Sequence, residues 1–323
     1  MKATLLGLDA KAYVPHALHA RERAWVETNC YVDLWVEVLS AWGFDPHASL
    51  PFTFALDFEG DQWLFFKQPV GELASLYGLD VQELTIWKPV EEHVLEQTSR
   101  GRMVLVEVDA HFLPDTEGLT YRTGHSKTTI GIESIDTEAR TLGYFHNAGY
   151  FALSGDDYVG IFGLAERPLL PPYTEFVKLD RLVRRGEDEL VRMSLANLRE
   201  HLARRPTSNP VRRYAERFQS DVAWLGGQPP ETFHLYSFAT LRQLGACFEM
   251  AASYVRWLEA HGEKDLVRVA EACDRIANGA KSLQFQLARA AVRKKPFDAA
   301  PSLSEMADAW DVATGELASR YPR

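Results

Sequence analysis

The chain has 323 residues, of which 46% are hydrophobic and 25% are charged, the composition of an ordinary globular protein. Three cysteines are too few for a disulfide framework, and no apolar run reaches the ~18 residues of a membrane span. The net charge of −10 is uneven, because residues 1–175 carry 12 Lys and Arg against 26 Asp and Glu, whereas residues 176–323 carry 23 against 19. We therefore expect two domains, a cytoplasmic location without a signal peptide, and neither a membrane nor a nucleic-acid partner.

Residue patterns in the first half predict a mixture of helices and antiparallel strands. Asn29 is a suitable N-cap, and helical spacing of apolar residues predicts a helix from residue 30 to about Trp42 that ends at Gly43. Helices at 71–77 and 90–99 follow by the same criteria. Short or alternating apolar runs predict strands at 52–58, 62–67, 82–87, 103–108, 125–133 and 141–145, and at two places between 150 and 164. Helices followed by an antiparallel sheet indicate an α+β domain over residues 1–170.

The second half is predicted to be helical. Pro171-Pro172 interrupts regular structure and marks the expected domain boundary. Beyond it apolar residues recur with a helical period, which predicts a bundle of about five helices over residues 173–323. The last helix is expected to begin with the capping box formed by Ser302 and Glu305.

The polar residues that suit chemistry fall between residues 30 and 147. Cys30 begins a predicted helix, where free backbone N–H groups and the helix dipole favour a thiolate. His125 begins a strand and His146-Asn147 end the next, so a nucleophile, a base and an orienting group occur in that order. We favour Asn147 over His146 as the orienting group, because an amide oxygen accepts from an imidazole N–H without adding charge. Asp109 ends a strand, where it binds a substrate amine, supports an oxyanion region or merely caps the next loop.

This chain order resembles the papain-like cysteine fold. Residues 30–165 are most similar to the butirosin-type acyltransferases, which move an acyl group from a carrier-protein thioester to an amine. The resemblance rests on Cys30 at a helix start, on the stretch Val-Asp-Ala-His-Phe-Leu-Pro at 108–114, and on His125 opening a strand that contains Gly131. The whole chain also resembles an uncharacterised bacterial family of about this length that is linked to carrier-protein aminoacylation.

The resemblance implies an acyl or aminoacyl transferase that uses Cys30, His125 and Asn147. The acyl group would arrive on the phosphopantetheine arm of an acyl or aminoacyl carrier protein, and a small-molecule or peptide amine would accept it, with no cofactor bound permanently. Transfer through a Cys30 thioester and direct attack of the amine on the carrier thioester both remain open. Papain-like peptidases place a Gln six residues before the Cys, where this chain has Ala24, so Asn29, Thr28 and backbone N–H groups are the expected oxyanion donors.

Two other functions use the same residues. A cysteine peptidase or amidase would employ water as the acceptor, and a non-catalytic alternative makes the first half a degenerate papain-like fold that binds a carrier protein. Ten arginines between residues 181 and 217 suit docking of an acidic carrier protein, although a solvated helix surface explains them equally well.

The remaining histidines and cysteines do not indicate a metal site. The spacing of His93, His111 and His125 matches no helix or hairpin metal site, so no metal is expected. Cys247 and Cys273 fall on the apolar faces of predicted helices, and we interpret both as core residues.

Overall fold

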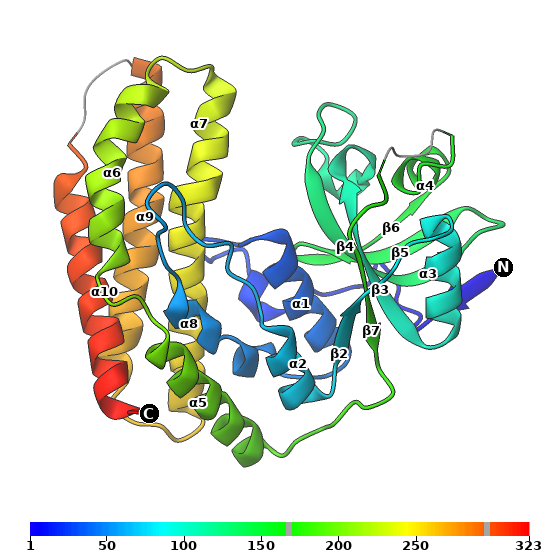
Figure 1. Ribbon diagram of the computed structural model, residues 1–323, viewed down its shortest axis with the longest axis horizontal. Helices are drawn as coiled ribbons and strands as arrows, with labels where there is room; N and C mark the ends of the chain where they lie inside the picture. The colour runs from blue at the N-terminus through cyan, green and yellow to red at the C-terminus, as the bar shows by residue number, and fades with distance from the viewer. Residues whose placement is uncertain (166–169, 294–297, 323) are drawn as a thin grey trace. The chain divides into compact units, whose positions relative to one another are not determined.

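The computed structural model describes residues 1–165, 170–293 and 298–322, which form two compact units (Figure 1). Unit 1 consists of Met1–Ala20, Asn29–Asp45 and Pro69–Arg184. Unit 2 consists of Arg21–Thr28, Pro46–Gln68 and Arg185–Arg323, so the chain contributes two early segments to unit 2 before it reaches the expected boundary. The predicted α+β class is confirmed, because unit 1 contains an antiparallel sheet and the C-terminal region is helical.

The sheet of unit 1 has seven strands among the described residues, and every pairing is antiparallel. The order is β2-β7-β3-β4-β5-β6, with β1 pairing with β4. The strands are β1 (Lys2–Thr4), β2 (Asp80–Glu83), β3 (Arg102–Asp109), β4 (Lys127–Asp136), β5 (Thr141–His146), β6 (Gly149–Ser154) and β7 (Thr174–Lys178). The expected hairpin is present as β4 and β5, in which Gly131 pairs with Phe145.

Helix α1 (Cys30–Ala41) begins and ends where local sequence signals place it. Asn29 accepts hydrogen bonds from the backbone N–H groups of Tyr31 and Val32 and so satisfies two donors of the first turn. At the other end, Gly43 adopts a φ of 74°, which glycine tolerates without a side-chain clash. The remaining helices of unit 1 are α2 (Val70–Tyr77), α3 (Val90–Ser99) and α4 (Asp156–Ile161).

The two faces of the sheet are covered by different helices. Alternate side chains of β3 point to opposite faces, and Val104 and Val106 share a core with Val94 of α3. On the other face, a side chain at Gly131 would lie 3.4 Å from Leu34 of α1. Figure 1 accordingly shows the strands running between α1 and α3.

Four local predictions were wrong. Residues 52–58 and 62–67 do not form strands, because Pro51–Ala55 is a 3-10 helix and the two segments share only the bridge between Phe58 and Trp63. Residues 156–161 are α4 and not a second strand after β6. Helix α10 begins at Ala300, so the supposed capping box lies inside the helix and caps nothing.

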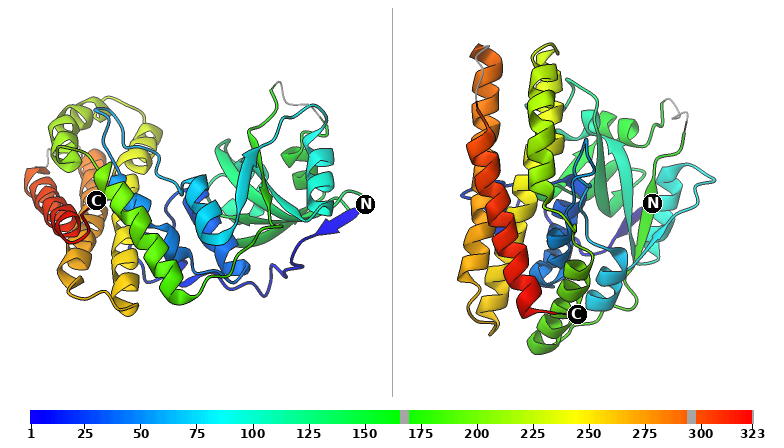
Figure 2. Two further views of the ribbon diagram at one scale, coloured as in Figure 1. Left: turned by 60° about the horizontal axis from the view of Figure 1, so that its bottom comes forward. Right: turned by 60° about the vertical axis from the view of Figure 1, so that its left-hand side comes forward.

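Unit 2 is built from long helices. They are α5 (Glu187–Ala203), α6 (Pro210–Leu225), α7 (Pro230–Ser237), α8 (Gln243–Ala260), α9 (Val267–Arg293) and α10 (Ala300–Arg320), with a π-helical turn at Phe238–Arg242 between α7 and α8. Helix α9 packs against both α8 and α10 (Figure 2). Cys247 and Cys273 are fully buried, and burial raises the pKa of both thiols, as expected for core residues.

Candidate functional site

Cys30 is the first residue of α1 and is half-buried. Its Sγ atom lies 4.0 Å from Oγ1 of Thr129, a residue of β4. The position at the N-terminus of α1 is the one expected from the sequence. The neighbour that the structure gives to the thiol is a hydroxyl group and not an imidazole.

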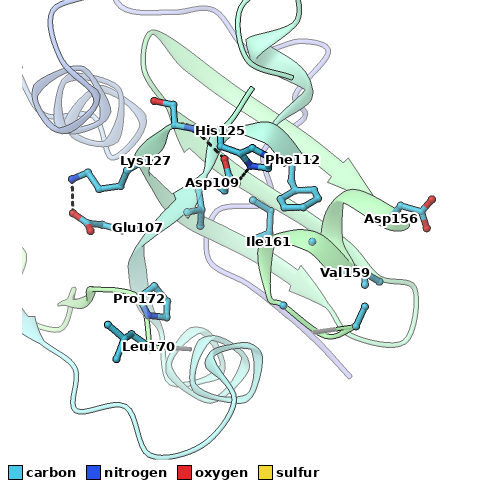
Figure 3. Close-up of a pocket in the computed structure, with 15 residues that line it drawn as sticks. Glu107, Asp109, Phe112, His125, Lys127, Asp156, Val159, Ile161, Leu170 and Pro172 are labelled. Atoms are coloured by element: carbon cyan, nitrogen blue, oxygen red, sulfur yellow. Dashed lines mark hydrogen bonds and ion pairs between the residues drawn. The ribbon is translucent and has the colours of Figure 1, made fainter. Parts of the chain in front are cut away.

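His125 immediately precedes β4 and is paired with a carboxylate. Its Nδ1 atom lies 2.6 Å from Oδ2 of Asp109, the last residue of β3 (Figure 3). The imidazole also stacks on the ring of His111, with centroids 4.6 Å apart and planes 11° from parallel. The His125 side chain is 74% exposed. Among the described residues, Nε2 of His125 has no hydrogen-bond partner and is open to a ligand.

Asp109 is held by three donors. Besides His125, the backbone N–H groups of His111 and Ser126 donate to Oδ1 at 3.0 and 3.2 Å. Burial raises the pKa of Asp109, but these hydrogen bonds, led by that from His125, outweigh burial and hold the pKa below its ordinary value. Asp109 is therefore the ionised group that orients the His125 ring, in place of Asn147 or His146.

His146 lies in a separate buried cluster. Its Nδ1 atom is 2.5 Å from Asp115 Oδ2, and its Nε2 atom is 2.8 Å from Thr128 Oγ1. The hydroxyl of Tyr144 donates to the other oxygen of Asp115 at 2.5 Å. Asn147 follows in the turn between β5 and β6 with a φ of 42°, a left-handed conformation that Asn tolerates better than most residues.

The sheet separates Cys30 from His146. Thr128 and Thr129 are successive residues of β4, so their side chains point to opposite faces. His146 contacts Thr128, whereas Cys30 lies beside Thr129. The expected combination of Cys30 with an orienting His146 is therefore not formed.

His125 is also separated along the chain from Thr129, the residue that contacts Cys30. It precedes Thr129 by four residues, which span at most roughly 13 Å of chain, and β4 itself begins only at Lys127. The structure therefore brings Asp109 to His125 and leaves Cys30 with Thr129.

An open hollow of about 990 Å³ lies beside the Asp109–His125 pair. Apolar side chains on its wall include Phe112, Val159, Ile161 and Leu170, and Figure 3 shows several of them around the pair. Gly160 is required in this wall, because a Cβ atom there would lie 2.2 Å from the Phe112 ring.

The charged groups of the hollow are mostly acidic. Glu107, Asp109 and Asp156 line it together with Lys127 and His125. Lys127 is engaged, because its Nζ atom lies 2.7 Å from Oε1 of Glu107. Three carboxylates against one lysine favour a ligand that carries a positive charge or an amine.

Sequence reasoning missed a second histidine cluster in unit 1. His19, which is 5% exposed, contacts Glu37 through Nδ1 and Asp33 through Nε2, at 3.2 Å from Oδ1 of Asp33. Burial lowers the pKa of His19, but the two carboxylates outweigh it and raise the pKa to about 9. The sequence offered one signal of this cluster: Asp33 and Glu37 lie one turn apart on the otherwise apolar α1. Buried carboxylates of this kind need a polar partner.

The stacking of His111 on His125 could not be read from the sequence, because it depends on the fold of the loop after β3.

Among the described residues, no group of three His, Cys, Asp or Glu side chains is arranged to hold a metal ion. A search of the described helices finds none that is long and apolar enough to cross a membrane.

Comparison with known proteins identifies the family. Residues 14–179 match the model of the DUF1839 N-terminal domain, and residues 187–319 match that of the DUF1839 C-terminal domain. No curated protein matches the chain. Since the two models together span most of its length, the chain belongs to the DUF1839 family.

Proposed function

We propose that this protein is an acyl or aminoacyl transferase in which the Asp109–His125 pair activates an amine acceptor. The observation that carries the proposal is the carboxylate-bound imidazole beside an open, mostly acidic hollow. A His whose Nδ1–H is held by a carboxylate presents Nε2 as a base, the arrangement used in general-base catalysis. We propose that the protein carries out this reaction in the cytoplasm.

The proposed step is a direct transfer. The amine nitrogen attacks the carbonyl carbon of a thioester on the phosphopantetheine arm of a carrier protein, and His125 takes the proton of the amine. The C–S bond then breaks, and His125 returns the proton to the departing thiolate. This direct route needs no acylated Cys30, which agrees with the pairing of Cys30 with Thr129.

The chemistry of the hollow supports an amine as the acceptor. Its carboxylates attract an ammonium group, which loses one proton to solvent to become the free amine before His125 takes the second proton during the attack. The apolar wall around Phe112 suits the acyl chain or the body of the amine.

The second candidate is the covalent route through Cys30, in a papain-like fold. The position of the half-buried Cys30 at the capped start of α1 supports it. It requires a base for the thiol, and His125 would have to approach Cys30 from its present place beside Asp109.

The test is to supply acyl- and aminoacyl-pantetheine thioesters with primary amines and to measure thiol release and amide formation. We expect His125→Ala to lower the rate about 10²–10⁴-fold. Asp109→Asn should lower it by a comparable factor, because Oδ1 is held by the backbone N–H groups of His111 and Ser126 and the Asn amide would donate to Nδ1, which leaves the proton on Nε2. If transfer is direct, Cys30→Ser should leave the rate unchanged. Loss of transfer in Cys30→Ser, together with an acylated Cys30 in the mass spectrum of the wild type, would establish the covalent route.

The matched control is His234→Ala, which removes an exposed histidine from α7 in unit 2. Release of thiol without amide would identify water as the acceptor and favour the peptidase or amidase alternative. A His125→Ala variant as active as the wild type, or no turnover with any thioester, would refute the proposal and leave carrier-protein binding without catalysis.

A further inference from the structure

One surface of unit 2 exposes large apolar side chains next to cations. On α7 and the following π-helical turn, Leu235 is 70% exposed and Phe238 is 45% exposed. On α9, Phe285 is 56% exposed. Together with Arg242 and Lys281 these residues form what we call the α7–α9 face. π-Helical turns such as Phe238–Arg242 frequently occur at functional sites.

Two contacts fix how the helices of this face lie against each other. Gln284 donates to the hydroxyl of Ser237 at 2.7 Å. The indole N–H of Trp25 donates to the carbonyl of Ala277 at 3.0 Å, and a side chain at Gly245 would collide with that indole ring. Residue numbers therefore rise along one helix as they fall along the other, so α9 runs antiparallel to the α7–α8 segment. This register places Phe238 near Phe285 and Arg242 near Lys281.

The two cations of the face are bordered by aromatic rings. Lys281 Nζ lies 4.2 Å from the centre of the Trp25 ring and 5.7 Å from that of Phe285. The guanidinium of Arg242 lies 5.1 Å from the Phe238 ring. Such contacts are favourable but do not neutralise the cation.

Among the described residues Lys281 makes no direct ion pair, and the carboxylate that acts on it, Glu249, does so less strongly than Arg242 repels it. Arg242, in contrast, lies 3.3 Å from Glu27. Burial, and then the nearby charge of Arg242, lower the pKa of Lys281. An anion that bound at this point would relieve the repulsion between the two cations.

Two of the arginines that first suggested docking are less available. Arg212 pairs with Asp308 and Asp311 at 2.8 Å in each case. Arg217 Nε lies 2.6 Å from Asp221 of the same helix. A guanidinium held by a carboxylate must give up that contact before it binds a partner, so these positions are poorer docking sites than Lys281.

We propose that the α7–α9 face is the docking surface for an acidic carrier protein. The inference rests on the proposed function, which supplies the carrier protein as acyl donor. Carboxylates of the partner would pair with Lys281 and Arg242, while its apolar side chains would cover Leu235, Phe238 and Phe285. Exposed aromatic and aliphatic residues beside two cations, of which Lys281 makes no direct ion pair among the described residues, suit an acidic helix.

The experiment measures binding of the full-length protein to a purified bacterial acyl carrier protein in its phosphopantetheine-bearing form, by titration calorimetry. We expect Lys281→Glu and Phe285→Ala each to raise Kd about tenfold. Binding should also weaken when the salt concentration is raised, because salt screens the ion pairs.

Two control variants change similar side chains elsewhere. Arg275→Glu reverses an exposed charge on α9, six residues from Lys281 and so roughly 120° around the helix. Leu119→Ala removes a 77% exposed apolar side chain from unit 1. Both should bind the carrier protein as the wild type does.

The outcomes separate the docking proposal from the proposed function. If Lys281→Glu slows transfer from the carrier protein but not from a free pantetheine thioester, both proposals stand. Binding that depends on the face, without any transfer, supports docking and refutes the transferase. Transfer or binding that is indifferent to Lys281 and Phe285 overturns the docking surface, as does the absence of binding at about 1 mM carrier protein. Self-association of the wild type that Phe285→Ala abolishes would assign the face to a second copy of this chain.

Discussion

Two of the histidines of unit 1 that contact carboxylates through Nδ1, His125 and His19, differ sharply in exposure. His125 pairs with Asp109 at the edge of a hollow, and its side chain is 74% exposed. His19 pairs with Glu37 and Asp33, and the side chains of all three are fully buried. In the first pair one ring nitrogen remains open to a ligand, whereas in the second both nitrogens are occupied by protein groups.

The difference shows that a histidine–carboxylate contact serves catalysis or structure according to what surrounds it. Glu37 also accepts from the hydroxyl of Tyr13 at 2.6 Å and from the backbone N–H of His16 at 3.0 Å. The buried cluster therefore attaches the N-terminal segment to α1. The exposed pair leaves its imidazole free to exchange a proton with a ligand.

The largest expected effect comes from breaking the buried cluster. Glu37→Gln should lower the free energy of unfolding by about 3–5 kcal/mol, because the buried His19 loses a negatively charged partner. Urea unfolding followed by circular dichroism measures the change. Glu138→Gln is the control, since Glu138 is 86% exposed and pairs with the N-terminal amine, so its loss should cost less than about 1 kcal/mol. Equal midpoints for the two variants would show that the cluster is not structural.

The pH dependence of stability gives a second test of the buried cluster. The pKa of His19 is raised from 6.5 to about 9 in the folded protein. Its protonated form is favoured by folding, so the added stability, up to about 3 kcal/mol, is present below pH 6.5 and is lost as pH rises through about 9. Unfolding curves from pH 6 to 10 measure it. His19→Gln should remove this slope, and a wild type equally stable across the range would contradict the prediction.

The exposed pair depends on packing around the hollow. Gly160→Ala should lower the free energy of unfolding by about 1–3 kcal/mol, because the new methyl group must displace the Phe112 ring. Gly71→Ala is the matched control: nothing lies within 4 Å of the new Cβ, and alanine is the better helix former. Thermal unfolding compares the two, and an undisturbed Gly160→Ala protein would mean that the ring moves without cost.

The smallest effect concerns the ring that stacks on His125. His111→Ala should lower the transfer rate about fivefold, because His125 loses the flat neighbour that restricts its orientation. His111→Phe keeps an aromatic ring at that place and should retain most of the activity. Steady-state kinetics with the pantetheine thioester distinguishes the variants. Equal losses in both would assign the effect to the hydrogen bond from His111 to Gly124 and not to stacking.

The local elements were largely predictable, and the errors have identifiable causes. Helix α1 has an Asn cap and a terminal Gly, and β3 and β4 are strongly apolar, so their signals lie within the segments themselves. Residues 52–58 alternate like a strand, but Pro51 begins a 3-10 helix there. Strand β7 was missed because it lies after Pro171-Pro172, where the sequence suggested that the sheet had ended.

The candidate residues were only partly predictable. His125 and Asp109 were both chosen, each for its place at a strand end, but their pairing was not foreseen. Asn147 was preferred because it ends the next strand along the chain, whereas Asp109 lies directly across from Lys127 on the neighbouring strand β3.

The sequence by itself determined the α+β class, the start of α1 at Cys30 and the strand ends that carry Asp109 and His125, because caps and hydrophobic periodicity act over a few residues. Only the tertiary structure decided which side chains meet. Pairing of β3 with β4 joins Asp109 to His125, and the alternation of β4 puts His146 and Cys30 on opposite faces of the sheet. Register and face depend on contacts between residues that are distant in the chain, and no local pattern specifies them.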